Sequence, residues 1–399
     1  MNRARSVPRL LLAACVACGG VFALLYFNAF ADCVQSGCGT FLLPYNVPDH
    51  FIYATVIDGL DDIAWWLPIA SNHGVGVLYG QLLLPLAGVT SDGLIGFSFV
   101  VNMSVYAATL WLYVRLAQKL FSNTRSVVFL AFYPPFLFFS ALINKDIFLT
   151  FLLLAIAWCL MERRYGWLAL VTSLLALVRV QYCVLPLLSW VLVHGRFARR
   201  FVLLYVVTSL GAALLTRFSS VFDVVGANAS SGITDLIYAL NRNYLVGSLL
   251  LNPLRAIQYP LSLAQGWTLV FNAEGIDLMK LTEGLTFFWF VGTAPGVYRF
   301  MRRSKRSPWS YEERVLRAMI CAFALILLLT SITEPRYLMA LYPLLLLAAV
   351  RSLRLSPRRA RRRHPAPITS PATDAVRRDV SPTPMATGNE IRCAASTAS

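Results

Sequence analysis

The fold depends on residues 167–200, which read WLALVTSLLALVRVQYCVLPLLSWVLVHGRFARR. The apolar part of this stretch, Trp167 to His194, carries Arg179 near its centre. A single helix here would move the basic residues at 196–200 to the outside of a membrane, and with them those at 302–306. Both placements violate the tendency of Lys and Arg to stay in cytoplasmic loops. Two half-length helices meeting at Arg179 satisfy it, so the sequence predicts a helical hairpin.

The chain around this hairpin is apolar as well. Of its 399 residues, 58% are hydrophobic and 14% are charged, whereas about 25% charged residues is usual in a soluble domain. Several apolar runs approach the roughly 20 residues that span a bilayer as a helix. The sequence therefore predicts an all-α polytopic integral membrane protein with about ten transmembrane helices. Apart from the hairpin, the spans are expected near 10–27, 92–114, 126–143, 147–161, 201–215, 281–298, 317–333 and 337–350.

The distribution of charge predicts the sidedness. Arg3, Arg5 and Arg9 precede the first apolar run, which places the N-terminus in the cytoplasm. Because this run is longer than the core of a typical signal peptide, it is expected to remain as an uncleaved anchor. The C-terminus is also expected in the cytoplasm. Seven of the 35 Lys and Arg then fall outside, namely Lys145, Arg179, Arg217, Arg242, Arg255, Lys280 and Arg336. Most acidic residues also fall outside, which is consistent with a reaction centre on the outer face.

The domain organisation follows from these spans. Residues 1–350 form the transmembrane domain, and its two long outer loops, near 32–91 and 216–280, are expected to hold short amphipathic helices. Residues 351–399 are basic and then rich in Pro, Ser, Thr and Ala, which predicts a disordered cytoplasmic tail held near anionic membrane lipids. The sequence does not decide whether Cys33 and Cys38 form a disulfide.

The net charge of +16 raises the question of nucleic-acid binding. Lys and Arg occur in short clusters between apolar runs, as they do in cytoplasmic loops. No basic face interleaved with exposed aromatic residues stands apart from those runs. Nucleic acid is therefore excluded as a partner.

Four segments place ionisable residues at the expected outer face, and charges near membrane depth are costly enough to indicate function. The first is residues 45–53, which include Asp49 and His50. The others are the Asn144-Lys145-Asp146 turn, the hairpin tip at Arg179, and residues 333–337. The last of these contains Glu334, Arg336 and Tyr337.

Together these segments resemble the GT-C class of glycosyltransferases, most closely the bacterial branch of protein mannosyltransferases and aminoarabinose transferases. The motifs are Asp49 in the first outer loop, the Lys145-Asp146 turn, Leu177-Val178-Arg179, and Glu334-Pro335-Arg336-Tyr337-Leu338 leading into Tyr342-Pro343-Leu344-Leu345-Leu346-Leu347. The resemblance spans most of residues 1–350. It departs from the family where Asp49 is followed by His50, because the family commonly has an Asp-Glu pair in this loop.

The resemblance implies transfer of a sugar from a polyprenyl-phosphate carrier at the outer face of a bacterial inner membrane. The acceptor would be a glycan, a lipid or a protein. Such a reaction needs a carboxylate to deprotonate the acceptor hydroxyl, for which Asp49 is the candidate. It also needs cations at the departing phosphate, for which Lys145, Arg179 and Arg336 are candidates. Asp146 or Glu334 would orient these cations or bind a divalent metal, and Tyr337 and His50 complete the candidate substrate-binding set.

Other interpretations of these residues stay open. Asp49 can be a turn or helix-cap residue after Pro48, and Asp146 can cap the following helix. Glu334 can simply pair with Arg336. At the level of function, an oligosaccharide repeat-unit polymerase or ligase shares this topology, and a non-enzymatic transporter or flippase also places charges in the membrane. The sequence shows no internal repeat, which favours an enzyme over a transporter.

Overall fold

The computed structural model describes residues 3–36, 48–59, 64, 68, 73–90, 93–218, 232–272, 275–303, 308–329 and 335–354. The chain divides into two units, Met1–Leu355 and Ser356–Ser399, and every described residue belongs to the first. The tail predicted over 351–399 thus lies, from Leu355 onward, outside the described residues. Cys38, and the side chain of Cys33, lie outside them as well.

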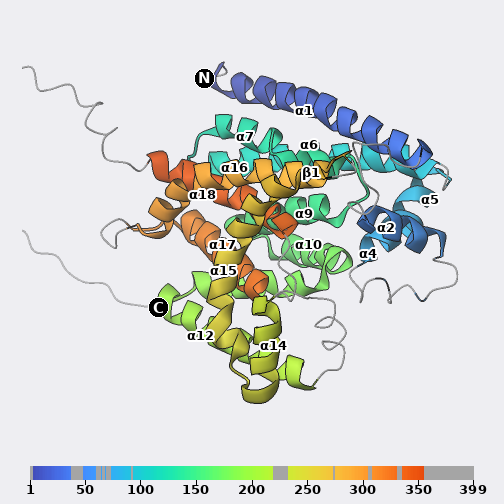
Figure 1. The fold of residues 1–399 in the computed structure, drawn as a ribbon. Helices are drawn as coiled ribbons and strands as arrows, with labels where there is room; N and C mark the ends of the chain where they lie inside the picture. Colours follow the sequence, from blue (N-terminus) through green and yellow to red (C-terminus); the bar gives the residue numbers. More distant parts are fainter. Residues whose placement is uncertain are drawn as a thin grey trace, which may run out of the picture. The chain divides into compact units, whose positions relative to one another are not determined.

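The described part of the chain is helical except for one short antiparallel pair (Figure 1). That pair joins β1 (Phe271–Asn272) to β2 (Gly275–Ile276). The longer helices are α1 (Arg3–Ser36), α2 (Pro48–Asp58), α6 (Leu94–Lys119), α9 (Lys145–Glu162), α10 (Tyr165–Val178), α11 (Leu185–Val193), α12 (Phe197–Phe218), α14 (Gly232–Tyr244), α15 (Gly247–Gln265), α16 (Leu278–Met301), α17 (Tyr311–Leu329) and α18 (Tyr342–Arg354). Shorter elements are α4 (Gly74–Val77), η2 (Leu78–Leu83), α5 (Leu84–Ala87), η4 (Thr124–Ser126), α7 (Val127–Ala131), α8 (Pro134–Ser140), η5 (Val180–Val184), η6 (Gly266–Leu269) and η7 (Pro335–Leu338).

Three described helices are long and apolar enough to cross a membrane. They are the Arg9–Ala31 part of α1, α6 and α12, and a fourth span results if the bent pair α8 and α9 is counted as one. Four further apolar helices are shorter, among them Tyr165–Val178, Val180–Val193 and Tyr342–Leu353. The helices are consistent with a membrane protein, while the expected number of about ten spans stays a prediction.

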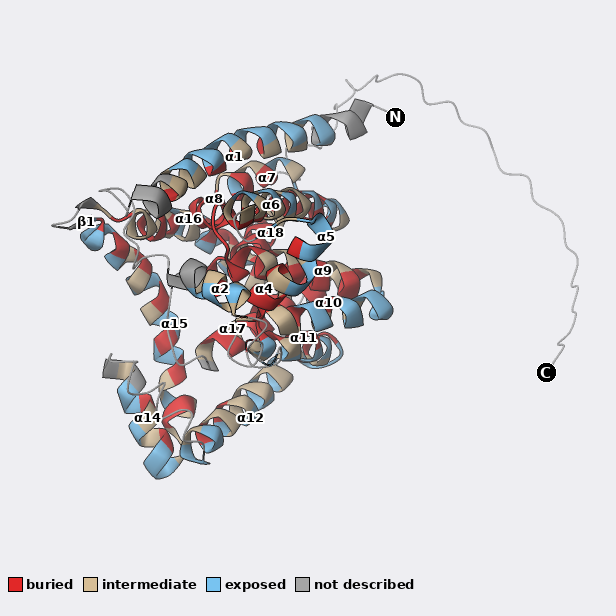
Figure 2. Ribbon diagram, turned by 90° about the vertical axis from the view of Figure 1, so that its right-hand side faces the viewer, coloured by how far each residue is buried: buried red, intermediate tan, exposed pale blue. Residues whose placement is uncertain are grey.

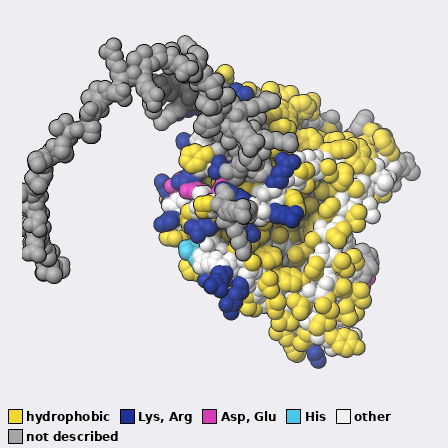
Figure 3. Space-filling view, turned by 90° about the vertical axis from the view of Figure 1, so that its left-hand side faces the viewer, with side chains coloured by type: hydrophobic (Ala, Val, Ile, Leu, Met, Phe, Trp, Pro, Cys, Tyr) yellow, Lys and Arg dark blue, Asp and Glu magenta, His cyan; other side chains and the backbone are white. Residues whose placement is uncertain are grey.

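The surface and the interior differ as expected for helices that lie in a membrane. Large hydrophobic side chains are exposed on α1 and α12, for example Leu25 and Leu203, each about 60% exposed. Figure 2 shows the buried residues gathered around α9 and α17 and the exposed ones on the outer faces of α1, α12 and α14. Figure 3 shows Lys and Arg side chains gathered over part of one face, beside a wide hydrophobic surface.

The predicted break at Arg179 is confirmed. α10 ends at Val178, and Arg179 has an extended backbone conformation with φ −157° and ψ 100°. The chain then folds back toward α10, as the contact between the Cys183 thiol and the Thr172 carbonyl shows: the thiol donates to that carbonyl over 3.6 Å. In a continuous helix these residues would lie about 16 Å apart along the axis. Two short helical segments therefore meet at Arg179 instead of one long helix.

The span expected near residues 126–143 is not one continuous helix. α7 ends at Ala131 and α8 begins at Pro134, with Tyr133 extended between them at ψ 115°. Pro134 and Pro135 lack a backbone N–H, and a proline also disfavours a helical conformation in the residue before it. A second bend of 119° separates α8 from α9. These two breaks let α9 enter the core at a steep angle to α8.

The two long segments near 32–91 and 216–280 contain helices in their described parts, as predicted. The first segment holds α2, α4, η2 and α5, and the second holds α14, α15 and η6. Gly247 forms the tight corner between α14 and α15, since a Cβ there would lie 2.2 Å from the Ile237 carbonyl oxygen. Asn241 fixes the same corner, because its amide Oδ1 accepts from the Ser248 backbone N–H over 2.8 Å. Ser248 Oγ also accepts from Asn241 Nδ2 over 2.8 Å.

Candidate functional site

A buried ion pair joins two of the predicted segments. Arg179 Nη2 donates to Asp146 Oδ1 over 3.0 Å, and the two side chains are 2% and 1% exposed. Asp146 lies in the first turn of α9, and the residue that caps this helix is Asn144, whose Oδ1 accepts from the Asp146 N–H over 2.6 Å. The interpretation of Asp146 as the helix cap is therefore wrong. Its carboxylate is instead available to Arg179, which lies 33 residues later in the chain.

The last predicted segment reaches the same place. The Arg179 guanidinium lies over the ring of Tyr337, 4.4 Å from its centroid. The Arg336 guanidinium lies 5.8 Å from the centroid of that ring. η7 thus brings a second arginine beside the first, with an aromatic ring in contact with both. Such stacking leaves the edges of a guanidinium available as hydrogen-bond donors.

Lys145 connects this cluster to α2. The Lys145 side chain is 8% exposed, and its Nζ lies 5.9 Å from the centroid of the fully buried Tyr53 ring. Tyr53 also contacts the His73 ring at a centroid distance of 5.9 Å. Asp49 belongs to α2 and precedes Tyr53 by one helical turn. The structure therefore brings α2 to Lys145, while the side chains of Asp49 and His50, and the whole of Glu334, lie outside the described residues.

The ion pair has unused hydrogen-bonding capacity. Asp146 Oδ2 and Arg179 Nε are buried and have no hydrogen-bond partner among the described residues. The Tyr182 hydroxyl is in the same situation and lies within electrostatic range of both side chains. Buried polar atoms without partners are costly and are found mostly where water, an ion or a ligand completes the bonding. The cluster can therefore accept a further polar ligand.

A metal site is not evident in this cluster. Among the described residues, no group of three or more His, Cys, Asp or Glu side chains is arranged to hold a metal ion. Asp146 is committed to Arg179 through one of its two carboxylate oxygens. The described part of the site thus pairs one carboxylate with Arg179 and places Arg336 and Lys145 nearby.

Two cavities follow each other along α16. The first has a volume of about 10 Å³ and is lined by Arg336 with Thr286 and Glu283, the latter paired with Lys280 at 2.8 Å. This is close to the smallest volume that holds one water molecule. The second is an open groove of about 440 Å³. Its lining residues are Phe129, Phe288, Trp289, Gly292, Thr293, Tyr342, Leu346, Ala349, Val350 and Leu353.

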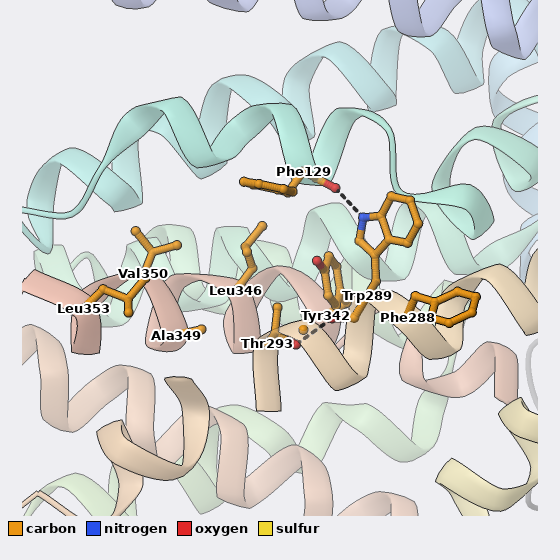
Figure 4. A pocket seen from close by; sticks show the side chains of 10 residues that line it. Phe129, Phe288, Trp289, Thr293, Tyr342, Leu346, Ala349, Val350 and Leu353 are labelled. Atoms are coloured by element: carbon orange, nitrogen blue, oxygen red, sulfur yellow. Dashed lines mark hydrogen bonds between the residues drawn. The ribbon is translucent and has the colours of Figure 1, made fainter. Parts of the chain in front are cut away.

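The groove is almost entirely apolar. Figure 4 shows Trp289 and Thr293 from α16 facing Leu346 and Val350 from α18, with Phe129 of α7 across the opening. Trp289 Nε1 donates to the Phe129 carbonyl over 3.1 Å, which holds one wall of the groove. Thr286 in the small cavity lies one helical turn before Trp289. The groove therefore begins about one turn from the cavity that Arg336 lines.

Sequence reasoning missed several polar residues near this site. Arg255 was counted only as an outer charge, yet it is 3% exposed and its Nη1 donates to the Leu328 carbonyl over 3.3 Å. Asn252, Tyr259 and Tyr182 are buried as well. The available signal was the spacing of Asn252, Arg255 and Tyr259, which places three polar side chains on one face of the helix.

Comparison with known proteins adds no family to this geometry. No protein family, no curated protein and no solved structure matches the chain. The resemblance noted in the sequence therefore stays a prediction.

Proposed function

We propose that this protein is an inverting membrane glycosyltransferase of the GT-C type, which moves a sugar from a polyprenyl-phosphate carrier to a glycan, lipid or protein acceptor. One observation carries the proposal. Cations from three distant segments lie in one buried region: Arg179 pairs with Asp146, Arg336 and Arg179 both contact the Tyr337 ring, and Lys145, next to Asp146 in the chain, contacts Tyr53. An apolar groove begins about one helical turn from the cavity that Arg336 lines. A lipid-linked phosphate has the same two parts, an anionic head and an apolar tail.

The three cations would stabilise the phosphate leaving group. When the bond between the anomeric carbon and the phosphate oxygen breaks, negative charge grows on the phosphate. Arg179 and Arg336 supply planar donors to that charge and Lys145 supplies a compact one. Asp146 holds Arg179 in place through a single bond, which leaves Nε free to donate to the phosphate. Because the cavity at Arg336 has a volume of only about 10 Å³, phosphate binding requires a shift of the Arg336 side chain.

The same displacement also needs a base that accepts the proton of the acceptor hydroxyl group. In the proposed step the acceptor hydroxyl oxygen bonds to the anomeric carbon and its proton passes to Asp49, while polyprenyl phosphate departs from the opposite side. α2 supports this role because Tyr53, one turn after Asp49, contacts Lys145. Inversion at the anomeric carbon follows from this single displacement.

The groove accounts for the tail of the carrier. Its volume of about 440 Å³ falls within the range of pockets that hold small apolar ligands. Because the carrier tail already lies in an apolar bilayer, the groove would select it through packing contacts and shape and not through removal from water. The proposal includes the membrane arrangement: about ten spans in a bacterial inner membrane, cytoplasmic termini, and the site at the outer face.

The purified protein with a radiolabelled donor tests this function. Wild-type protein should transfer sugar from a long-chain polyprenyl-phosphate sugar and release the carrier phosphate, and Asp49→Asn should abolish transfer. A protein that releases no carrier phosphate with any of a panel of sugars is a transporter or scaffold, and the proposal then fails. Products extended by whole repeat units identify a polymerase instead.

Gly292→Leu tests the groove in the same assay. A Cβ at Gly292 meets no atom within 4 Å, so leucine enters the groove without a backbone clash. The KM for the long-chain donor should rise roughly tenfold, and the KM for a farnesyl donor should change less. Gly211→Leu on α12 is the matched control, since a Cβ there also meets nothing within 4 Å and Gly211 does not line the groove. An equal effect of both variants would contradict the assignment of the groove.

A further inference from the structure

α15 buries a row of polar side chains against the site. Asn252, Arg255 and Tyr259 are 1%, 3% and 4% exposed and lie on one face of the helix at spacings of three and four residues. The end of this row bonds to the last turn of α17, because the Tyr259 hydroxyl donates to the Leu327 carbonyl over 3.3 Å. α15 also packs against η7, the element that carries Arg336 and Tyr337.

This row lies beside the cation cluster, because α15 packs against η7, which carries Arg336 and Tyr337. The Tyr182 hydroxyl group interacts electrostatically with both Tyr259 and Arg179. From Tyr259 to Asn252 the helix rises by about 10 Å, which is comparable with the length of a disaccharide. A ligand whose phosphate reaches Arg179 can therefore present its remaining polar groups along α15.

Among the buried asparagines that the structure describes, Asn252 is the exception. Neither its Oδ1 nor its Nδ2 has a hydrogen-bond partner among the described residues. By contrast, the amide of the equally buried Asn102 donates to the Leu142 carbonyl and accepts from the Tyr79 hydroxyl. A primary amide that is removed from water needs both a donor and an acceptor opposite it. Asn252 therefore has bonding capacity that the described part of the chain does not use.

The position of α15 is secured without Asn252. Pro253 lacks the N–H that would bond to the Leu249 carbonyl, and the Tyr205 hydroxyl of α12 donates to that carbonyl over 2.6 Å instead. The Asn241–Ser248 corner fixes the start of the helix. The contacts that hold α15 in place thus do not include the Asn252 side-chain amide.

We propose that Asn252 and the adjoining face of α15 form a subsite for the hydroxyl groups of a carbohydrate, an inference that rests on the proposed function. A carboxamide offers one donor and one acceptor side by side, which suits two neighbouring hydroxyl groups on a sugar ring. Tyr259 extends the same surface toward the phosphate-binding cations. The sugar is either that of the donor or that of the acceptor, and both have this chemistry.

Asn252→Leu in the full-length purified protein tests the subsite, with Asn102→Leu as the matched control. Because leucine replaces an amide without partners, Asn252→Leu should keep or raise the unfolding temperature, whereas Asn102→Leu should lower it. The probes are farnesyl phosphate, its glucosyl, mannosyl and galactosyl esters, and the corresponding methyl hexosides. Asn252→Leu should bind farnesyl phosphate like the wild type and bind one class of sugar probe about tenfold more weakly.

Each outcome decides the inference. Weaker binding of the glycosyl esters alone assigns the subsite to the donor sugar, and weaker binding of the methyl hexosides assigns it to the acceptor. Unchanged binding of every sugar probe overturns the inference, as does a fall in unfolding temperature equal to that of Asn102→Leu. Failure of the proposed function is recognised separately, because wild-type protein would then release no carrier phosphate in the labelled-donor assay.

Discussion

Two buried carboxylates, Glu313 and Asp146, pair with arginine in different ways. Glu313 Oε2 accepts from Arg303 Nη1 over 2.7 Å and from the Ser310 backbone N–H over 2.9 Å, while Oε1 accepts from Arg351 Nε over 2.8 Å. Both of its oxygens are therefore used, and the bonds tie the end of α16 to α17 and α18. Asp146 has one side-chain bond, to Arg179, and a second oxygen with no partner among the described residues.

The difference separates a structural cluster from a candidate binding cluster. A fully bonded carboxylate has little left for a ligand and contributes to stability through its partners. A partly bonded one costs stability, because desolvated atoms remain without bonds. Proteins accept that cost mainly where function requires the group. On this basis Glu313 holds helices together, whereas the Asp146–Arg179 pair keeps hydrogen-bonding capacity for a ligand.

The largest effect is expected for Arg179→Met. It leaves the Asp146 carboxylate buried without its partner, so the free energy of unfolding should fall by about 3–5 kcal/mol. Sugar transfer should fall by at least about 100-fold, because a cation at the leaving phosphate is lost. Thermal unfolding in detergent and the labelled-donor assay measure the two effects.

The double variant Asp146→Leu/Arg179→Met separates folding from function. Removing both charges should restore most of the stability, since apolar replacements of a buried ion pair are often neutral or stabilising. Transfer activity should stay as low as in the single variant. A stable and active double variant would show that the pair is structural, like the Glu313 cluster.

A smaller effect is expected for Glu313→Gln. Arg303 and Arg351 are 14% and 17% exposed and so remain partly hydrated when the carboxylate is lost. Unfolding should become easier by about 2 kcal/mol, and the transfer rate per folded molecule should not change. Glu312→Gln, which removes the same charge one residue away, is the control and should have a smaller effect on unfolding. Loss of kcat in folded Glu313→Gln would break the distinction between the two clusters.

The smallest effect is a dependence on pH. Burial by itself would raise the pKa of the Glu313 carboxyl, but the Ser310 N–H, Arg351 and Arg303 outweigh it and hold this pKa below its ordinary value of 4.5. Stability from Glu313 is then fully present above pH 4.5 and is lost as the pH falls through the lower pKa of the folded state. The difference in unfolding temperature between wild type and Glu313→Gln should shrink below pH 4.5. A constant difference down to pH 3 would contradict this role.

The helix break at Arg179 was predictable because it depends on a rule that acts along the chain. Basic loops on the wrong side of a membrane at 196–200 and 302–306 exclude one long helix, whatever the packing. The break before Pro134 was missed because the hydropathy of the segment does not reveal it. Hydropathy over 126–143 is uniform, and only the missing N–H groups of two successive prolines indicate that the helix ends there.

The sequence by itself determined that the chain is built of apolar helices. It also identified Lys145, Asp146, Arg179 and Arg336 as ionisable residues next to or within apolar stretches, where a charge is costly. Hydropathy, proline and charge act over a few neighbouring positions, so they can be recognised in a single chain. The tertiary structure alone decided that Asp146 pairs with Arg179 and that Asn252 is buried without a described partner. Such pairings depend on how helices pack across the molecule, and local sequence does not specify that.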